Sequence, residues 1–284
     1  MPSMRDIKRR RESIRSTGQI TKAMKLVSTV KLQKARVHAL DTQPYFDAML
    51  ETMRSVVSHS EWSTSPVLAG NASDKKVVLL ISGNRGLAGG YNGNIAKLVM
   101  SETDPENTVI WSVGRKGRDM LEKKGYTLGK DYSDVINQPL YSDAIEIGKD
   151  LLDAYMSGEV GEVWIAYTFF KNTVSHIPQM EKLLPLSAGD FAEDPDTPDL
   201  MMNFEPHEGR ALEMIVPKYL NSLIYGGLIQ AFASENGARM QAMDNATSNA
   251  EEMIDDLSLQ YNRARQGAIT QELTEIVAGA SAVE

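Results

Sequence analysis

The sequence predicts an α+β protein: two very long terminal helices, paired as an antiparallel coiled coil, flank a central doubly wound α/β domain. Helical patterns with few breaks run from about residue 4 to 57 and from about 209 to the end. Both exceed the 8–20 residues of typical globular helices. Between them, strand and helix patterns alternate. Helices drawn from both chain ends favour a mechanical or assembly role over a catalytic one. The expected divisions are a helix over 1–58, a linker over 59–74, an α/β domain over 75–208 and a helix over 209–284.

In the amino-terminal helix, apolar residues recur in steps of three and four, which marks one face of a helix. They are Ile20, Met24, Val27, Val30 and Val37, with Ile7 and Ile14 upstream. Pro44 predicts a kink or a short break. The helical pattern then resumes and dissolves in a Ser/Thr-rich stretch, which is typical of a linker.

The central region begins with a continuous apolar run over 77–81, as expected for a strand buried on both faces of a parallel sheet. Further strands are predicted over 109–113, 162–169 and about 174–184. Helices are predicted over 92–101, 115–124 and 142–156. This alternation indicates a doubly wound, Rossmann-like sheet.

A glycine-rich turn follows the first strand and is the obvious candidate for nucleotide binding. Its glycines Gly83, Gly86 and Gly89 are three apart, which fits neither dinucleotide nor P-loop spacing, and no Lys-Ser/Thr pair follows. A tight strand-to-helix turn is the better interpretation. The chain has no cysteine, and its four histidines are scattered singly. We therefore predict no catalytic residue, no cofactor and no metal site.

The carboxyl-terminal helix has the clearest periodicity. Its apolar and small residues advance by about 3.5 on average, as in a coiled-coil seam. They are Met243, Ala246, Ala250, Met253, Leu257, Tyr261, Ala264 and Ala268. At ~1.5 Å per residue this helix would extend roughly 100 Å and its partner roughly 75 Å, so its end should overhang as a single helix.

Charge is unevenly distributed. The whole chain carries −8, yet residues 1–36 hold eleven basic and two acidic side chains, a local charge of +9. This is either a solvated helix face or a basic collar that meets an acidic partner. Nucleic acid is a weaker alternative, because the segment has no aromatic residue for stacking. No apolar run approaches the ~18–20 residues of a membrane span, and the start lacks a signal-peptide pattern.

Four segments, in order along the chain, resemble motifs of the gamma-subunit family of F-type ATP synthases. They are residues 13–28 (SIRSTGQITKAMKLVS), 82–90 (SGNRGLAGG), 238–247 (ARMQAMDNAT) and 269–280 (ITQELTEIVAGA). The absence of a chloroplast-type cysteine pair and of a transit peptide favours a bacterial form.

The resemblance implies a non-catalytic rotor shaft that couples ion translocation to ATP synthesis or hydrolysis. Its implied partners are three alpha and three beta subunits, the epsilon subunit and the membrane c-ring, with no nucleic acid and no membrane insertion. The implied location is the cytoplasmic face of the bacterial cell membrane, as a peripheral protein. The coupling ion, proton or sodium, is left open because its ligands lie in other subunits.

The resemblance also implies which residues contact partners. Positions that match contacts with beta-subunit loops are Arg265, Gln266 and Thr270, with Glu272 close by. Positions that match a collar pressed by acidic beta-subunit segments are Lys22, Met24, Lys25 and Arg239. Two alternatives from other classes are a nucleotide-dependent α/β enzyme that dimerises by its helices, and a free-standing adaptor or nucleic-acid binder that uses the basic helix.

Overall fold

The computed structural model describes residues 3–58, 70–186 and 208–281. It divides into two units. The terminal unit contains residues 1–28 and 240–284, and the central unit contains residues 29–239. Two long helices, α1 (Met4–Ser58) and α6 (Glu208–Ser281), contribute to both units. Most of the expected linker, residues 59–69, lies outside the described residues.

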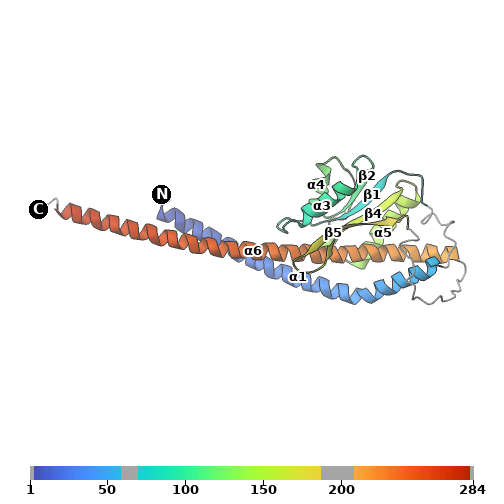
Figure 1. Cartoon of the computed structure of the whole chain (residues 1–284), viewed down its shortest axis with the longest axis horizontal. Helices are drawn as coiled ribbons and strands as arrows, with labels where there is room; N and C mark the ends of the chain where they lie inside the picture. Colours follow the sequence, from blue (N-terminus) through green and yellow to red (C-terminus); the bar gives the residue numbers. More distant parts are fainter. Residues whose placement is uncertain (1–2, 59–69, 187–207, 282–284) are drawn as a thin grey trace. The chain divides into compact units, whose positions relative to one another are not determined.

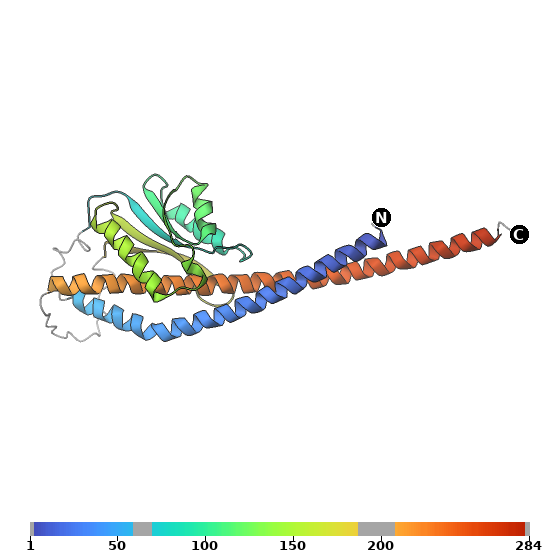
Figure 2. The ribbon, with the colours of Figure 1, turned by 180° about the vertical axis from the view of Figure 1, so that it is seen from behind.

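In the terminal unit, α1 and α6 run antiparallel. The Arg11 guanidinium lies over the Tyr261 ring at 5.3 Å, and further along α1 the Thr21 and Thr247 hydroxyls share a hydrogen bond of 2.8 Å. Residue numbers therefore rise along α1 as those of its contacts on α6 fall. Gly18 permits close approach, because a Cβ there would lie 3.3 Å from the Ala250 Cβ. Figures 1 and 2 show the two segments side by side, with α6 continuing past the amino end of α1.

The face of α1 that packs on α6 differs from the apolar stripe in the sequence. Ile20 and Val27 are 58% exposed, whereas Thr21 and Ser28 are buried. All but one of the buried or half-buried positions of this part of α1, Met24 being the exception, repeat every seven residues. They are Ile7, Ile14, Thr21 and Ser28 in one row, and Arg11, Gly18 and Lys25 in the other. The seam therefore consists largely of small and polar side chains, which hydrophobicity alone does not reveal.

The α6 side of this seam follows the sequence pattern closely. Met243, Ala250 and Leu257 are buried, and Ala246, Tyr261, Ala264 and Ala268 are half-buried. Met253 was expected in the seam, but it is 52% exposed. The seam position between Ala250 and Leu257 is occupied by Ile254 instead, which is half-buried.

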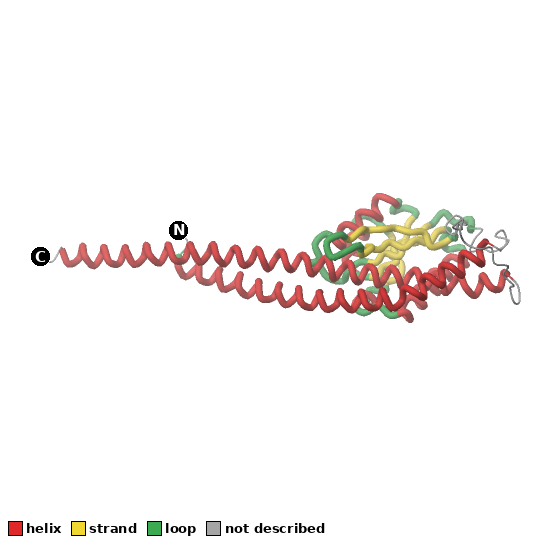
Figure 3. The backbone as a smooth tube through the Cα atoms, turned by 60° about the horizontal axis from the view of Figure 1, so that its bottom comes forward, coloured by secondary structure: helices red, strands yellow, loops and turns green. Residues whose placement is uncertain are grey.

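The central unit is built on a five-stranded sheet of order β3-β2-β1-β4-β5. Its strands are β1 (Lys76–Ile81), β2 (Thr108–Val113), β3 (Thr127–Asp131), β4 (Glu162–Phe170) and β5 (His176–Leu184). The first four are parallel, and β5 pairs antiparallel with β4. This confirms the predicted mixed α/β class and the mostly parallel sheet (Figure 3). Strand β3 had no counterpart in the sequence patterns.

Helices cover both faces of the sheet. Val78 and Leu80 of β1 pack in one apolar cluster with residues of α3 (Tyr91–Glu102) and α4 (Arg115–Glu122). Val77, Leu79 and Ile81 pack in a second cluster with α5 (Tyr141–Met156), α6 and the end of α1. A short 3-10 helix, η2 (Val135–Asn137), precedes α5. Since alternate β1 side chains are buried on opposite faces, the continuous apolar run is explained.

The prediction about Pro44 needs correction. Helix α1 continues through Pro44, so the expected break does not occur. A proline removes only one backbone donor, and Phe46, Met49 and Met53 anchor the following turns in the core. Pro217 also lies within a helix, since α6 begins at Glu208.

A polar cluster marks the start of β4. Glu162 accepts hydrogen bonds from the Trp164 indole at 2.9 Å and from Lys182 and Lys76 at 2.8 and 3.0 Å. Desolvation alone would raise the pKa of Glu162, but these donors outweigh it and lower the pKa to about 2. The cluster ties β1, β4 and β5 together.

Candidate partner-binding surfaces

The carboxyl-terminal part of α6 presents polar side chains to solvent. Arg265, Gln266, Thr270 and Glu272 are all exposed. Arg265 and Glu272 are seven apart, and Gln266 and Thr270 are four apart, so the four lie on two adjoining rows of the helix. The Thr270 hydroxyl donates to the Gln266 backbone carbonyl at 2.9 Å. The structure thus brings these four predicted residues together.

An apolar row accompanies them. Ile269, Leu273, Ile276 and Val277 are between 49% and 67% exposed. Their spacing of four, seven and eight residues is that of one helix face. Directional donors beside an exposed apolar face are features of a protein-binding surface.

The predicted collar residues of α1 lie in the terminal unit beside the exposed apolar stripe. Lys22 is exposed, and Met24 and Lys25 are half-buried. The Lys25 ammonium pairs with Asp244 at 2.6 Å, with side chains 38% and 53% exposed. A pair this exposed contributes little to stability, so Lys25 remains able to exchange partners. Ile20, Leu26 and Val27 add exposed apolar surface to this part of α1.

Arg239 differs from the other predicted contacts. It belongs to the central unit, where its guanidinium pairs with Glu235 at 2.6 Å and approaches the Gly86 carbonyl at 3.4 Å. The side chains of Arg239 and Glu235 are only 13% and 9% exposed. Its geometry is that of an internal ion pair on α6. The i, i+4 spacing of the two residues is the signal that could have indicated this pair from the sequence.

This ion pair lies at the carboxyl edge of the parallel strands, where doubly wound proteins bind ligands. A Cβ on Gly83 would lie 2.9 Å from the Glu235 carboxylate, so α6 packs directly against the glycine turn. The turn is closed by the Gly83 amide, which donates to the Asn92 side chain at 2.8 Å. Burial and the Glu235 carboxylate raise the pKa of Tyr91, whose hydroxyl donates to the Ala231 carbonyl. The side chains of Glu235 and Asn92 thus occupy the space beside Gly83.

Comparison with known proteins decides the family. The family model described as ATP synthase matches residues 3–283. The ATP synthase gamma chain of Lachnoclostridium phytofermentans is 60% identical over 290 residues, covering all of both chains. The chain belongs to the ATP synthase gamma-chain family. A gamma chain described as sodium ion specific, from Acetobacterium woodii, is 41% identical and covers 99% of each chain.

Solved structures share the fold of this gamma-family chain. A chain from the Euglena gracilis mitochondrial ATP synthase, in a structure of its OSCP, F1 and c-ring, is similar with a TM-score of 0.68 at 19% identity. That match covers 99% of this chain and 94% of the other. A chain from the rotor of the same enzyme gives a TM-score of 0.67 at 17% identity, covering 94% and 98%.

Among the described helices, none combines the length and apolar character needed to cross a membrane. Within residues 3–58, 70–186 and 208–281, no three His, Asp or Glu side chains are grouped as metal ligands.

Proposed function

We propose that this chain is the central rotor shaft of an ATP synthase, turning between a membrane c-ring and a ring of alternating alpha and beta subunits. The observation that carries this proposal is the antiparallel helix pair of the terminal unit, in a chain of the gamma family. We infer that the pair is a coiled coil, with a seam repeating every seven residues in α1. The shaft makes no bond in ATP itself.

Torque transmission requires a stiff and asymmetric element. The close approach at Gly18 and Ala250 joins two helices along the seam, which resists bending better than one helix. The exposed side of α1 is basic and apolar, and the exposed side of α6 has a different set of side chains. Rotation therefore presents different faces to successive catalytic sites. Differential contact with open and closed states then biases their populations.

Two surfaces fit the proposed contacts. Arg265, Gln266, Thr270 and Glu272 are proposed to contact beta-subunit loops, and Lys22, Met24 and Lys25 to face acidic beta-subunit segments. Arg239, which matches the same family region, is proposed as a further partner contact, with its guanidinium held by the pair with Glu235. The central α/β domain over 75–208 is proposed to contact the epsilon subunit and the c-ring. In this assembly the chain is peripheral to the cytoplasmic face of a bacterial cell membrane.

Reconstitution with alpha and beta subunits tests the proposal. One copy should join three of each, and ATPase activity of the complex should depend on it. The double variant Arg265→Ala with Gln266→Ala should reduce activity or assembly, whereas Arg263→Ala serves as an exposed neighbour control. Unchanged activity and assembly of the double variant would contradict the proposed contact of Arg265 and Gln266 with beta-subunit loops.

The collar calls for a separate measurement, because it concerns coupling more than assembly. Met24→Lys adds a charge beside Lys22 and Lys25 and should lower ATP-driven ion pumping relative to ATP hydrolysis in the membrane-bound enzyme. Met24→Leu is the matched apolar control. Wild-type pumping by Met24→Lys would count against a tight contact at this position.

A further inference from the structure

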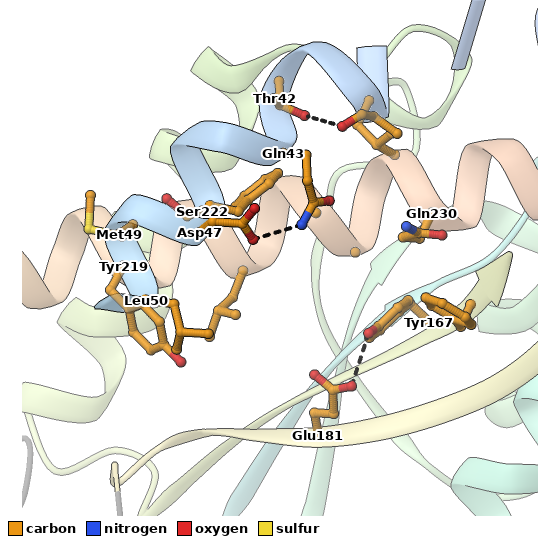
Figure 4. A pocket seen from close by; sticks show the side chains of 17 residues that line it. Thr42, Gln43, Asp47, Met49, Leu50, Tyr167, Glu181, Tyr219, Ser222 and Gln230 are labelled. Carbon is orange, nitrogen blue, oxygen red and sulfur yellow. Dashed lines mark hydrogen bonds between the residues drawn. The ribbon is translucent and has the colours of Figure 1, made fainter. Parts of the chain in front are cut away.

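The central unit contains a cavity of about 270 Å³ between α1, α6 and the β4–β5 side of the sheet. Figure 4 shows side chains from all three elements directed into it. Pockets for small molecules have volumes from about 300 Å³ upward, so this one is at the small end of that range. At about 30 Å³ for each water-sized group, it accommodates roughly nine such groups.

The walls of the cavity are largely apolar and aromatic. They include Phe46 and Leu50 from α1, Tyr219 and Leu223 from α6, and Tyr167 from β4. Two glycines of α6, Gly226 and Gly227, also line it. Such a lining favours an apolar, preferably flat or branched, ligand body.

Two carboxylates give the cavity its charge. Asp47 lies on the α1 side and Glu181 on the sheet side (Figure 4). Each is oriented by a neutral donor: the Gln43 amide donates to Asp47 at 2.9 Å, and the Tyr167 hydroxyl donates to Glu181 at 2.9 Å. Burial and the Glu181 charge raise the pKa of Tyr167, so the phenol keeps the proton that it donates.

No positive group balances these acids. The described residues that line the cavity include no Lys, Arg or His. Asp47 and Glu181 form no ion pair within the parts of the chain that the structure describes. Each carboxylate uses one oxygen for its neutral donor and retains acceptor capacity on the other.

We propose that this cavity binds a small organic cation: a primary ammonium on an aromatic or branched apolar body of about nine non-hydrogen atoms. The apolar body fills the space between Phe46, Tyr219 and Tyr167, and the ammonium pairs with Glu181 or Asp47. An occupant of this kind connects α1 to the sheet and adds a contact to the central unit. The site contains none of the residues proposed above to contact the beta subunits.

Binding to the purified full chain tests the proposal with three probes of nearly equal size. They are 2-phenylethylammonium, the neutral 2-phenylethanol and the anionic 3-phenylpropionate. Saturation-transfer NMR measures binding, and thermal unfolding measures the stabilisation expected of a native-state ligand. We expect saturable binding of the ammonium, weaker binding of the alcohol and none of the carboxylate.

Variants locate the site. Glu181→Gln and Asp47→Asn together should weaken ammonium binding by roughly tenfold, while binding of the alcohol stays unchanged. Glu51→Gln, an exposed acid on α1 outside the lining, is the matched control and should bind as the wild type does. Unfolding of each variant without ligand shows that it is folded. Equal binding of ammonium and alcohol, unchanged ammonium binding by the double variant, or no saturable binding of the ammonium would each overturn the proposal.

Discussion

The internal ion pair between Arg239 and Glu235 makes a sharp prediction about stability. We consider Arg239→Met, Glu235→Met and the double variant. Each single substitution leaves one charged group in a site whose side chains are 13% and 9% exposed. The double variant removes both charges and places two flexible apolar side chains against the glycine turn. Stability should therefore fall in each single variant and largely recover in the double one.

The magnitude follows from burial. Two unit charges 4 Å apart attract by about 4 kcal/mol at the effective dielectric constant of ~20 that suits such sites. Breaking a buried pair by removing one partner costs about 3–5 kcal/mol, whereas replacing both charges by apolar groups is often nearly neutral. Because some solvent reaches Arg239, we expect about 3 kcal/mol for each single variant and a coupling energy of at least ~2 kcal/mol.

Urea unfolding of the full chain measures these values. Trp111 in β2 and Trp164 in β4 report on the central sheet by fluorescence. The matched control is Lys25→Met, which breaks a pair of the same 2.6 Å length that is far more exposed. Circular dichroism follows that variant, which should lose less than about 1 kcal/mol. A loss below ~1 kcal/mol in Arg239→Met as well would refute the reasoning that burial makes the pair structural.

Three other predictions concern the seam, the sheet and a turn. Gly18→Leu should destabilise the terminal unit by about 1–3 kcal/mol in thermal unfolding, while Ile20→Lys changes it by less than ~0.5 kcal/mol, since only Gly18 faces α6. Glu162→Gln should cost about 1–2 kcal/mol near neutral pH. That difference should shrink as pH falls from 4.5 towards 2, because the lowered pKa stabilises only the ionised carboxylate. Gly114→Ala should cost more than about 2 kcal/mol in urea unfolding, because φ is +108° and its Cβ would lie 1.9 Å from a backbone carbonyl; a smaller loss would show that the turn can relax.

The central sheet could be predicted where its strands are buried on both faces. Strands β1, β2 and β4 have apolar sequences because helices cover both sides. Strand β3 could not be found in this way. Its sequence, TLGKD, is polar and mostly exposed at the sheet edge, and its pairing depends on β2. Edge strands need few apolar residues, so a pattern search passes over them.

Some features of the candidate surfaces could likewise be predicted from the sequence, and others could not. Arg265 and Gln266 lie between the seam residues Ala264 and Ala268, so their exposure follows from the periodicity of the helix, which turns them away from α1. The i, i+4 spacing of Glu235 and Arg239 indicates their pairing, but the burial of the pair could not be predicted, because Gly83 and Glu235 are far apart in sequence and meet only through the fold. Which proteins contact these residues came from motif resemblance and not from their chemistry alone.

The distribution of apolar residues in the terminal unit indicates what surrounds it. In a helix pair that is stable alone in water, the largest apolar side chains face the partner helix and small or polar ones face solvent. Here part of the pattern is inverted. Thr21 and Ser28 are buried in the seam, while Ile20 and Val27 are 58% exposed. Small seam residues let the helices approach closely, which favours a thin and stiff pair.

Exposed apolar rows on both helices then need another explanation. Ile20 and Val27 on α1, and Leu273 and Ile276 on α6, would lose unfavourable contact with water if protein surrounded the pair. A shaft that turns inside a ring must be surrounded yet not held at one angle. Apolar side chains meet both conditions, because their contacts are non-directional and can be exchanged for similar ones at each step. On α6, Arg265 and Gln266 add directional donors to this surface. If they contact one partner at a time, as proposed, that contact would distinguish the catalytic sites.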